Sequence, residues 1–226
     1  MLVPRYYYAN TYDQFYEWLK NKPHEIRKYK KNDILFSYSE PISDIFYICS
    51  GIAEVTLLHE NGHEKILSFH SNGSIFPGCH DLDFKIERSI GMKAVTDIEV
   101  MVFRSSDFNR YLDENQALFR TMYNWYASYI NLLLYESAHQ EYNNSFTKLC
   151  NMLYLIAVNN DDVSGSDIRF THEELSKVLS VDRSNISRYL SKLRKEGILV
   201  THHNRIEITD IEHLQDYCTL ETIMAE

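Results

Sequence analysis

The hydrophobic pattern of this chain changes period near residue 104, and this change constrains the fold more than any other feature. Before it, apolar side chains alternate or form short runs rich in Val, Ile, Phe and Tyr, as in 44–51, 52–69 and 92–103. Such runs are typical of β-strands. After it, apolar residues recur every three or four positions, as in helices. All four prolines lie at or before Pro77. The sequence therefore predicts a β-rich part followed by a helical part.

Turn signals separate the strands of the first part. Asn61-Gly62 stands between two strand-like runs and is a strong hairpin signal, and Gly51, Gly73 and Gly78 mark further turns. Many short strands joined by tight turns favour an antiparallel barrel, jelly roll or sandwich.

The stretch His-Glu-Asn-Gly-His at 59–63 matches the H-E-x-x-H pattern of zinc proteases. That chemistry requires both histidines on one face of a helix. Asn61-Gly62 instead predicts a two-residue hairpin loop, which would send His59 and His63 to opposite faces of the sheet. We therefore do not expect an enzyme. A cupin-like metalloenzyme, which also uses a β-roll, is the enzyme alternative, but the sequence does not supply its set of inward ligands.

Composition narrows the class of protein. The chain has 226 residues, a net charge of −9 and 44% hydrophobic residues, which is ordinary for one large or two smaller globular domains. Neither the N-terminal residues nor the uncharged stretch 121–135 suits a signal peptide or a membrane span, so we expect a cytoplasmic protein without a membrane partner. The four cysteines are widely spaced, which argues against a disulfide framework or a cysteine-rich zinc site.

A long helical segment follows the strands, at 111–143. A mostly apolar seam follows three-four spacing over about three heptads, at Phe119, Met122, Tyr126, Tyr129, Leu133, Glu136 and Gln140. Further apolar residues lie off this seam, at Trp125, Ile130, Leu132 and Leu134. Two faces to bury indicate that the helix packs on its own sheet and also pairs with its copy in a homodimer.

The C-terminal part carries a basic helix in an otherwise acidic chain. Thr171 and Glu174 form a capping-box pattern for a first helix, and Asp182 is placed to cap a second one that ends at Gly197. One side of the second helix is apolar, at Ile186, Leu190 and Leu193. The other side is polar and basic, at Arg183, Ser184, Asn185, Ser187, Arg188 and Lys192.

Two short strand patterns around 198–208 then complete the signature of a winged helix-turn-helix, which binds double-stranded DNA. The alternative, a solvated basic surface helix, does not account for the capped helix before it and the wing after it.

This order of parts resembles the Crp/Fnr (cyclic-AMP receptor protein/fumarate–nitrate regulator) superfamily of bacterial transcription factors. The stretch 170–199 aligns without gaps to the helix-turn-helix of that family. The resemblance implies an α+β fold with an effector-sensing β-roll (jelly roll) of the cyclic-nucleotide-binding type at 1–110. A dimerisation helix follows at 111–143 and a winged helix-turn-helix at 144–226. The resemblance also implies that the protein binds a palindromic operator as a homodimer, with RNA polymerase as a further partner.

The resemblance assigns roles on the basic helix. Arg188 would contact guanine, and bidentate Arg to guanine is the strongest single base contact. Ser184 stands where many members have Glu, so the half-site would differ from the commonest one. Thr171 and the wing residues His202, His203 and Arg205 would contact phosphate. The predicted DNA-binding residues are Thr171, Arg183, Ser184, Asn185, Ser187, Arg188, Lys192 and His202.

The resemblance also places an effector site in the β-roll. Family members that bind cyclic nucleotides hold the ribose with a Glu after a glycine, and here that position is Cys79, so cyclic AMP is not expected. The pocket character resembles the subgroup that responds to halogenated phenols, which suggests a small aromatic or anionic effector. The predicted effector residues are Phe76, Gly78, Cys79, His80, Arg88, Ser89, Tyr126, Tyr129, Ile130 and Leu133. Two other interpretations stay open: that the tyrosines only pack, and that no effector binds at all.

The family also contains haem-based sensors with Cys and His ligands in this region, so Cys79 and His80 suggest a haem-based gas or redox sensor as the alternative function. It ranks lower, because adjacent side chains on a strand face opposite ways. We therefore expect no cofactor and no metal. An iron–sulfur sensor would need N-terminal cysteines, and the first cysteine here is Cys49.

Overall fold

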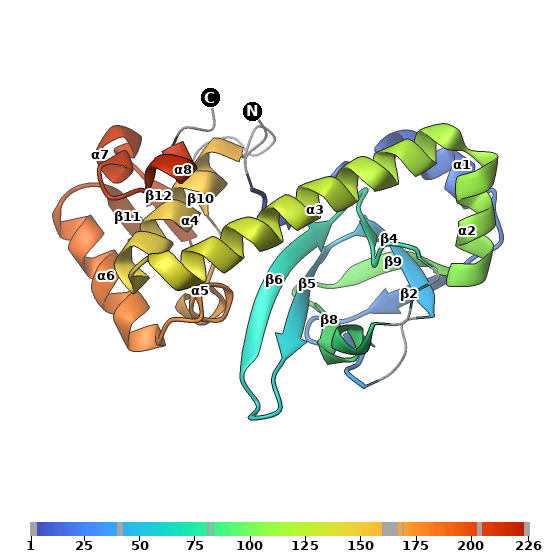
Figure 1. Cartoon of the computed structure of the whole chain (residues 1–226), viewed down its shortest axis with the longest axis horizontal. Coiled ribbons are helices and arrows are strands. Elements are labelled where there is room, and N and C mark those ends of the chain that lie inside the picture. The colour runs from blue at the N-terminus through green and yellow to red at the C-terminus, as the bar shows by residue number, and fades with distance from the viewer. Residues whose placement is uncertain are drawn as a thin grey trace. The chain divides into compact units, whose positions relative to one another are not determined.

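A computed structural model of the chain describes residues 4–39, 43–80, 82, 84–159, 167–168, 170–202 and 205–223. The chain divides into two compact units, Tyr6–Ala127 and Ser128–Glu226, the second together with Met1–Arg5. The boundary falls within the long helix α3, Gln116–Tyr142 (Figure 1). Each unit is described by itself.

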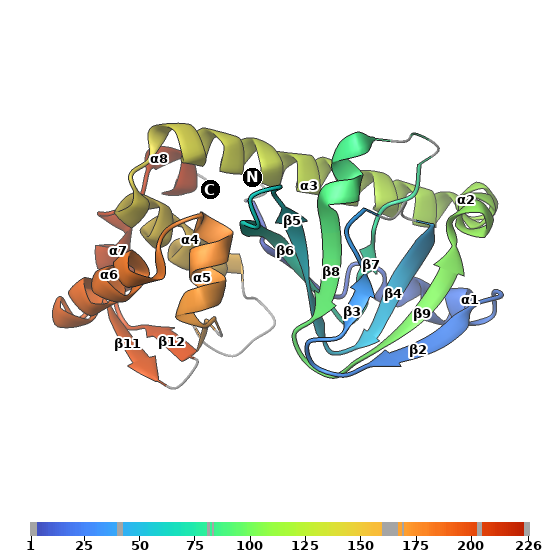
Figure 2. The same cartoon turned by 90° about the horizontal axis from the view of Figure 1, so that it is seen from below.

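Two antiparallel sheets build the first unit, as the alternating pattern predicts. One sheet has the order β1-β6-β5-β8-β3 and the other β2-β9-β4-β7, and Figure 2 shows β9 between β2 and β4. Only the two-residue strand β1 pairs in parallel among the described strands of these sheets. The strands are β1 Tyr7–Tyr8, β2 Glu25–Tyr29, β3 Ile34–Phe36, β4 Asp44–Ser50, β5 Ile52–Leu58, β6 Glu64–Ser71, β7 Ile75–Phe76, β8 Ile90–Ala94 and β9 Ile98–Arg104.

Large apolar side chains from both sheets fill the inside of this roll. Ile48, Val55 and Val100 are completely buried, and Phe46 and Phe103 are nearly so. The unit also contains α1 (Tyr16–Lys20), α2 (Ser105–Glu114), two short 3-10 turns (Asp13–Phe15 and Lys85–Ser89) and the first part of α3. Burial of this apolar surface supplies the main stabilisation of the roll.

The β5–β6 hairpin differs from its prediction. Leu58 pairs with Glu64, and the N–H of His59 donates to the carbonyl oxygen of His63 at 2.9 Å. The loop is therefore three residues long, with Gly62 in the left-handed region at φ 84°. The prediction of a two-residue loop was wrong. The glycine of Asn-Gly also suits the last position of a three-residue loop, which takes the left-handed conformation.

This register places His59 and His63 opposite each other, on the same face of the hairpin, and not on opposite faces as predicted. Across the described residues, no group of three or more His, Cys, Asp or Glu is placed to hold a metal ion.

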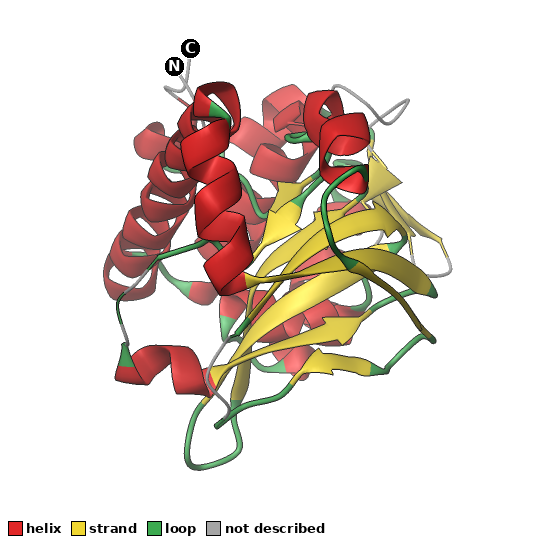
Figure 3. Cartoon of the chain, turned by 90° about the vertical axis from the view of Figure 1, so that its right-hand side faces the viewer, coloured by secondary structure: helices red, strands yellow, loops and turns green. Residues whose placement is uncertain are grey.

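The second unit contains the predicted helix-turn-helix and wing. Helix α4 packs on α5, α6 and α7, and a three-stranded sheet has the order β10-β12-β11. Figure 3 distinguishes its helices (red) from the strands (yellow). The elements are α4 Ser145–Asn159, β10 Asp167–Ile168, α5 His172–Leu179, α6 Arg183–Lys195, β11 Leu199–His202, β12 Arg205–Ile208, α7 Ile211–Gln215 and α8 Leu220–Ile223.

The exposed apolar face of helix α3 overlaps the predicted seam only in part. Met122 and Glu136, both assigned to the seam, are buried within the single chain at 2% and 8% exposure. The exposed apolar residues form a neighbouring stripe, which we call the α3 stripe: Phe119, Tyr123, Ile130, Leu133 and Leu134. The seam prediction was therefore wrong for Met122 and Glu136, whereas Phe119 and Leu133 of the predicted seam belong to the exposed stripe. A helix with apolar residues on two faces does not reveal which face its own core takes. Of the described helices, none combines the length and the apolarity that crossing a membrane requires.

Candidate nucleic-acid interface and effector site

The capping box that starts α5 forms as predicted. The Thr171 hydroxyl accepts a hydrogen bond from the Glu174 N–H at 3.1 Å, and the Glu174 carboxylate accepts one from the Thr171 N–H at 2.7 Å. Two backbone donors at the helix start are thereby satisfied. The Thr171 hydroxyl, predicted to meet phosphate, is engaged in this cap.

A tight turn fixes α6 relative to α5. Ser180 adopts the left-handed conformation at φ 52°, and the Ser176 hydroxyl donates to the carbonyl oxygen of Val181 at 2.6 Å. Asp182 stands at the N-cap position of α6, as predicted, but its side chain makes no capping hydrogen bond there. The turn, and not this cap, sets the direction of α6.

Helix α6 has one buried and one exposed side. Ile186, Leu190 and Leu193 are buried at 2% exposure or less, whereas Arg183 and Arg188 are exposed. Ser184 and Lys192 are exposed as well, and Asn185 and Ser187 are half-buried. The prediction that the apolar side of this helix is buried and its basic side exposed is confirmed.

Two side chains organise Arg188. Its Nη2 donates to Oδ1 of Asn185 at 2.9 Å, and its guanidinium lies 5.2 Å from the centre of the Tyr189 ring. An arginine held by a hydrogen bond and an aromatic face loses less rotamer freedom when it binds a planar partner. Arg188 is thus held on the exposed side of α6 by two neighbours on the same helix.

Two other predicted residues have protein partners that the sequence did not reveal. Oγ of Ser187 lies 2.9 Å from Nδ1 of His172, which ties α6 to the first turn of α5. The Lys192 ammonium lies over the rings of Phe146 and Tyr217, at 4.2 and 4.7 Å from their centres. Lys192 therefore rests on an aromatic surface made by α4 and the segment after α7.

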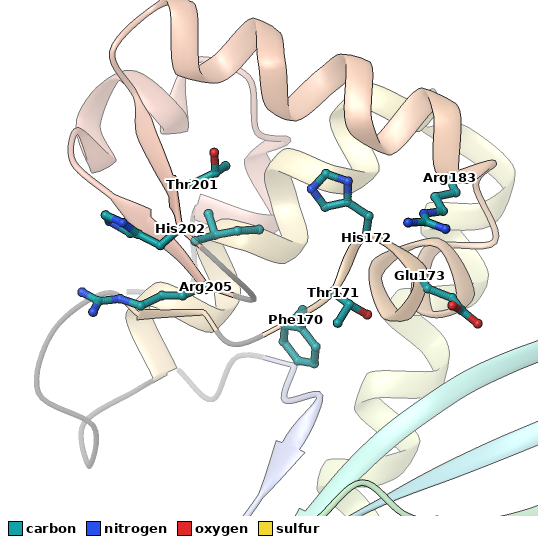
Figure 4. A pocket seen from close by; sticks show the side chains of 9 residues that line it. Phe170, Thr171, His172, Glu173, Arg183, Thr201, His202 and Arg205 are labelled. Atoms are coloured by element: carbon teal, nitrogen blue, oxygen red, sulfur yellow. The ribbon is translucent and has the colours of Figure 1, made fainter. Parts of the chain in front are cut away.

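A cleft of about 390 Å³ opens between the wing and the starts of α5 and α6 (Figure 4). Arg183, Arg205, His172 and His202 line it, with Glu173 as its acidic side chain. Its other lining residues are Phe170, Thr171, Thr201 and Ile206. Two guanidiniums and two imidazoles suit an anion such as a backbone phosphate. His203 lies outside the described residues.

His172 was not among the predicted site residues. It follows Thr171 in the Thr-x-x-Glu capping box that the sequence showed, and side chains of a helix tilt toward its N-terminus. A sequence signal for it was therefore available.

Two predicted effector residues of the first unit, Gly78 and Tyr126, lie next to each other. A Cβ at position 78 would overlap the Tyr126 hydroxyl, so the missing side chain of Gly78 makes room for that phenol. The Tyr126 oxygen is buried with no hydrogen-bond partner among the described residues, and burial raises the pKa of this phenol. Phe76 is buried beside them at 4% exposure.

Cys79 and His80 face different partners. The Cys79 thiol donates to Oδ1 of Asn109 on α2 at 3.0 Å, whereas His80 Nε2 lies 2.8 Å from a carboxylate oxygen of Glu87. Both residues lie after β7 and not on a described strand, so the strand argument does not apply to them. Their different partners do not favour a shared haem iron.

The structure does not gather the remaining predicted effector residues into one site. Arg88 is exposed on the 3-10 turn 85–89, where its carbonyl oxygen accepts from the Ser39 N–H at 2.7 Å, and Ser89 is half-buried there. Tyr129, Ile130 and Leu133 belong to the second unit, and Ile130 and Leu133 are exposed at 55% and 40%.

Sequence reasoning missed His70, which is completely buried inside the roll. Its Nε2 lies 3.1 Å from the Ser68 hydroxyl, and its ring lies 4.8 Å from Phe76 and 5.3 Å from Tyr8. Burial lowers the pKa of His70 to about 3, so the imidazole is neutral at physiological pH. The alternation of inward residues along 64–71 was the signal available for it.

Comparison with known proteins identifies the architecture. Residues 26–115 match the cyclic nucleotide-binding domain model and residues 147–217 match the Crp-like helix-turn-helix domain model. Together these models cover more than half of the chain, in the order found in one family of regulators. The chain belongs to the Crp/Fnr family.

Relatives and solved structures of this family match over most of their length. The cAMP-activated global transcriptional regulator CRP of Salmonella typhimurium is 22% identical over 199 residues, which are 87% of this chain and 94% of that protein. FixK2 from Bradyrhizobium japonicum superposes with a TM-score of 0.76 at 16% identity, over 88% of this chain and 98% of that one. CprK in complex with OCPA superposes with a TM-score of 0.74 at 15% identity, over 94% of this chain and 100% of that one. At such identities the structures show a shared fold.

This Crp/Fnr protein is thus a DNA-binding transcription regulator with an effector-binding domain, and its family is one of regulators and not of enzymes. The basic face of α6 and the cleft beside the wing belong to the DNA-binding part. Gly78 and His70 belong to the domain that matches the cyclic nucleotide-binding model.

Proposed function

We propose that this Crp/Fnr regulator binds a palindromic operator as a homodimer and that a small organic effector, not cyclic AMP, controls it through the β-roll. The observation that carries the proposal is Arg188, exposed on α6 and held by Asn185 and Tyr189. In this arrangement its guanidinium can donate two hydrogen bonds to one guanine in the major groove.

The α3 stripe supports the homodimer. Five exposed apolar residues follow one face of α3 over four turns, a pattern that a second copy of the same helix would cover. Two-fold symmetry of the protein would match a two-fold operator, with half-sites centred about 34 Å apart. RNA polymerase is the further partner that the family suggests.

The surroundings of Gly78 support an effector other than cyclic AMP. Cys79 occupies the position of the ribose-binding Glu, and its thiol donates to Asn109. The buried polar groups near Phe76 include the Tyr126 phenol and the neutral His70 imidazole, which suit a small aromatic molecule better than an ion. Arg88 lies at the surface, where a negatively charged substituent could reach it.

Three experiments test the proposal. Selection from random DNA duplexes should yield a palindrome with one G·C pair per half-site that depends on Arg188, and sedimentation should give a dimer. A selection without a palindromic consensus would reject the operator model. Thermal shift against nucleotides, haem and small aromatic acids should show stabilisation by an aromatic acid, because a ligand of the native state raises the melting temperature. Stabilisation by cyclic AMP or haem alone would reject the proposed effector class.

A further inference from the structure

A buried polar cluster lies where α3 meets α4, within the second unit. His139 and Glu136 on α3 are 5% and 8% exposed, and Asn151 on α4 and Thr222 on α8 are completely buried. Burying such groups is costly unless each finds a partner. Their partners therefore determine how α4 is held.

Asn151 has a fixed orientation in this cluster. Its Oδ1 accepts a hydrogen bond from the backbone N–H of Thr219 at 2.9 Å, and a backbone N–H can only donate. Its Nδ2 therefore points the other way, donates to the Thr219 hydroxyl at 3.3 Å, and lies 3.4 Å from both ring nitrogens of His139. Asn151 presents donors to the imidazole.

Only an unprotonated imidazole nitrogen can accept from that amide. If His139 were protonated, both of its ring nitrogens would carry a hydrogen and face the Asn151 NH₂. The hydrogen bond would then be lost, and a buried positive charge would lie beside hydrogen-bond donors. Burial accordingly lowers the pKa of His139, against the opposing influence of Glu136 and Glu221, while Lys148 acts with burial. The Tyr135 ring covers the imidazole at 3.7 Å, and its hydroxyl is bonded to Thr222 at 2.8 Å.

The cluster adjoins a short connection. Helix α3 ends at Tyr142 and α4 begins at Ser145, where Oδ1 of Asn144 accepts from the N–H groups of Phe146 and Thr147 at 3.0 Å. Lys148 donates to Oε1 of Gln140 across this connection at 2.8 Å. The buried contact between His139 and Asn151 thus joins α3 to α4 close to this connection.

We propose that His139 is a proton-controlled joint between the long helix and the DNA-binding domain. In its neutral form it accepts from Asn151 and holds α4 on α3. In its protonated form it leaves Asn151 and pairs with Glu136, one turn earlier on its own helix, so that α4 is released. The inference rests on the proposed function, because α4 belongs to the domain that carries α6, and acidification would then weaken control of operator binding by the effector.

Hydrogen exchange of the free full-length protein tests the joint without DNA. After correction for the intrinsic pH dependence of exchange, amides of α4 should lose protection as the pH falls from 7.5 to about 5.5. Each unit by which the folded pKa lies below the unfolded one allows up to about a tenfold loss. In His139→Gln, whose Oε1 accepts from Asn151 at every pH, protection should be independent of pH. His63→Gln, at an exposed loop, is the matched control and should behave like the wild type.

Asn151→Asp provides a second variant with the opposite sign. Its Oδ1 keeps the bond from Thr219, while its second oxygen accepts from a protonated imidazole, so acidification should now increase the protection of α4. The proposal is overturned if His139→Gln keeps the acid-dependent loss of the wild type, or if Asn151→Asp loses protection as the wild type does. Because no DNA is present, these outcomes are separate from the selection experiment, which tests the proposed function.

Discussion

Nη2 of Arg188 donates a hydrogen bond to Oδ1 of Asn185, 2.9 Å away and one turn earlier on α6. The Tyr189 ring supports the same guanidinium from the side. The arginine is thus oriented before DNA arrives, which reduces the entropy that binding must remove. Asn185 is therefore a residue that positions Arg188 as well as a candidate contact of its own.

We predict that Arg188→Ala costs about 1–3 kcal/mol of sequence-specific binding, mainly at one G·C pair in each half-site. Competition binding with operator variants at constant salt measures it. Arg194→Ala, an exposed cation later on the same helix, is the control and should weaken binding equally for all sequences. An unchanged base preference in Arg188→Ala would remove it from base readout.

We predict that glutamate on the α3 stripe weakens dimerisation and operator binding together. Leu133→Glu should do so, and Ile130→Glu should do so more strongly, because Ile130 lies nearer the centre of the stripe and Leu133 at its edge. Sedimentation gives the dimer constant and electrophoretic shift the affinity. Asn124→Glu, exposed on α3 but away from the stripe, should leave both unchanged. A monomeric Ile130→Glu with normal operator affinity would contradict the dimer.

We predict that the roll loses stability in acid through His70. Its pKa is about 3 in the folded chain and about 6.5 when unfolded, so the unfolded chain binds more protons between these values. The free energy of unfolding should therefore fall by up to about 1.4 kcal/mol per pH unit as the pH drops from about 6.5 toward 3, with no contribution above that range. Urea unfolding across this range measures it. His70→Phe should flatten the dependence and His63→Phe should not; equal slopes for both would refute the role of His70.

We predict that Gly78→Ala destabilises the first unit by about 1–3 kcal/mol, because the added methyl group overlaps the Tyr126 hydroxyl. Tyr126→Phe should change stability by less than about 0.5 kcal/mol, since that hydroxyl has no described partner to lose. Because Tyr126→Ala removes the ring that the methyl group would overlap, Gly78→Ala should cost less stability in a Tyr126→Ala background than in the wild type. Thermal unfolding of Gly78→Ala, Tyr126→Ala and the double variant measures this, and additive losses in the double variant would refute the contact.

Interactions within a few residues could be predicted from the sequence. The Thr171–Glu174 capping box, the buried side of α6 and the wing depend on spacings of two to four residues, which a short window contains. The family architecture followed from the order of such segments.

Contacts between distant residues could not be predicted in this way. The phase of α3 depends on which of two apolar faces the roll covers, and the β5–β6 register depends on a loop conformation that Asn-Gly leaves open. The local sequence pattern predicts neither the buried face of α3 nor the register of this hairpin.

The sequence by itself determined the kinds of element, their order and the exposed basic side of α6, because hydrogen bonding and periodicity act over one or two turns. Only the tertiary structure decided that Ser187 meets His172, that His70 is buried, and that Asn151 turns its amide toward His139. The Asn151 orientation depends on Thr219, 68 residues further along the chain. Such contacts arise when packing removes water from groups that must then satisfy one another.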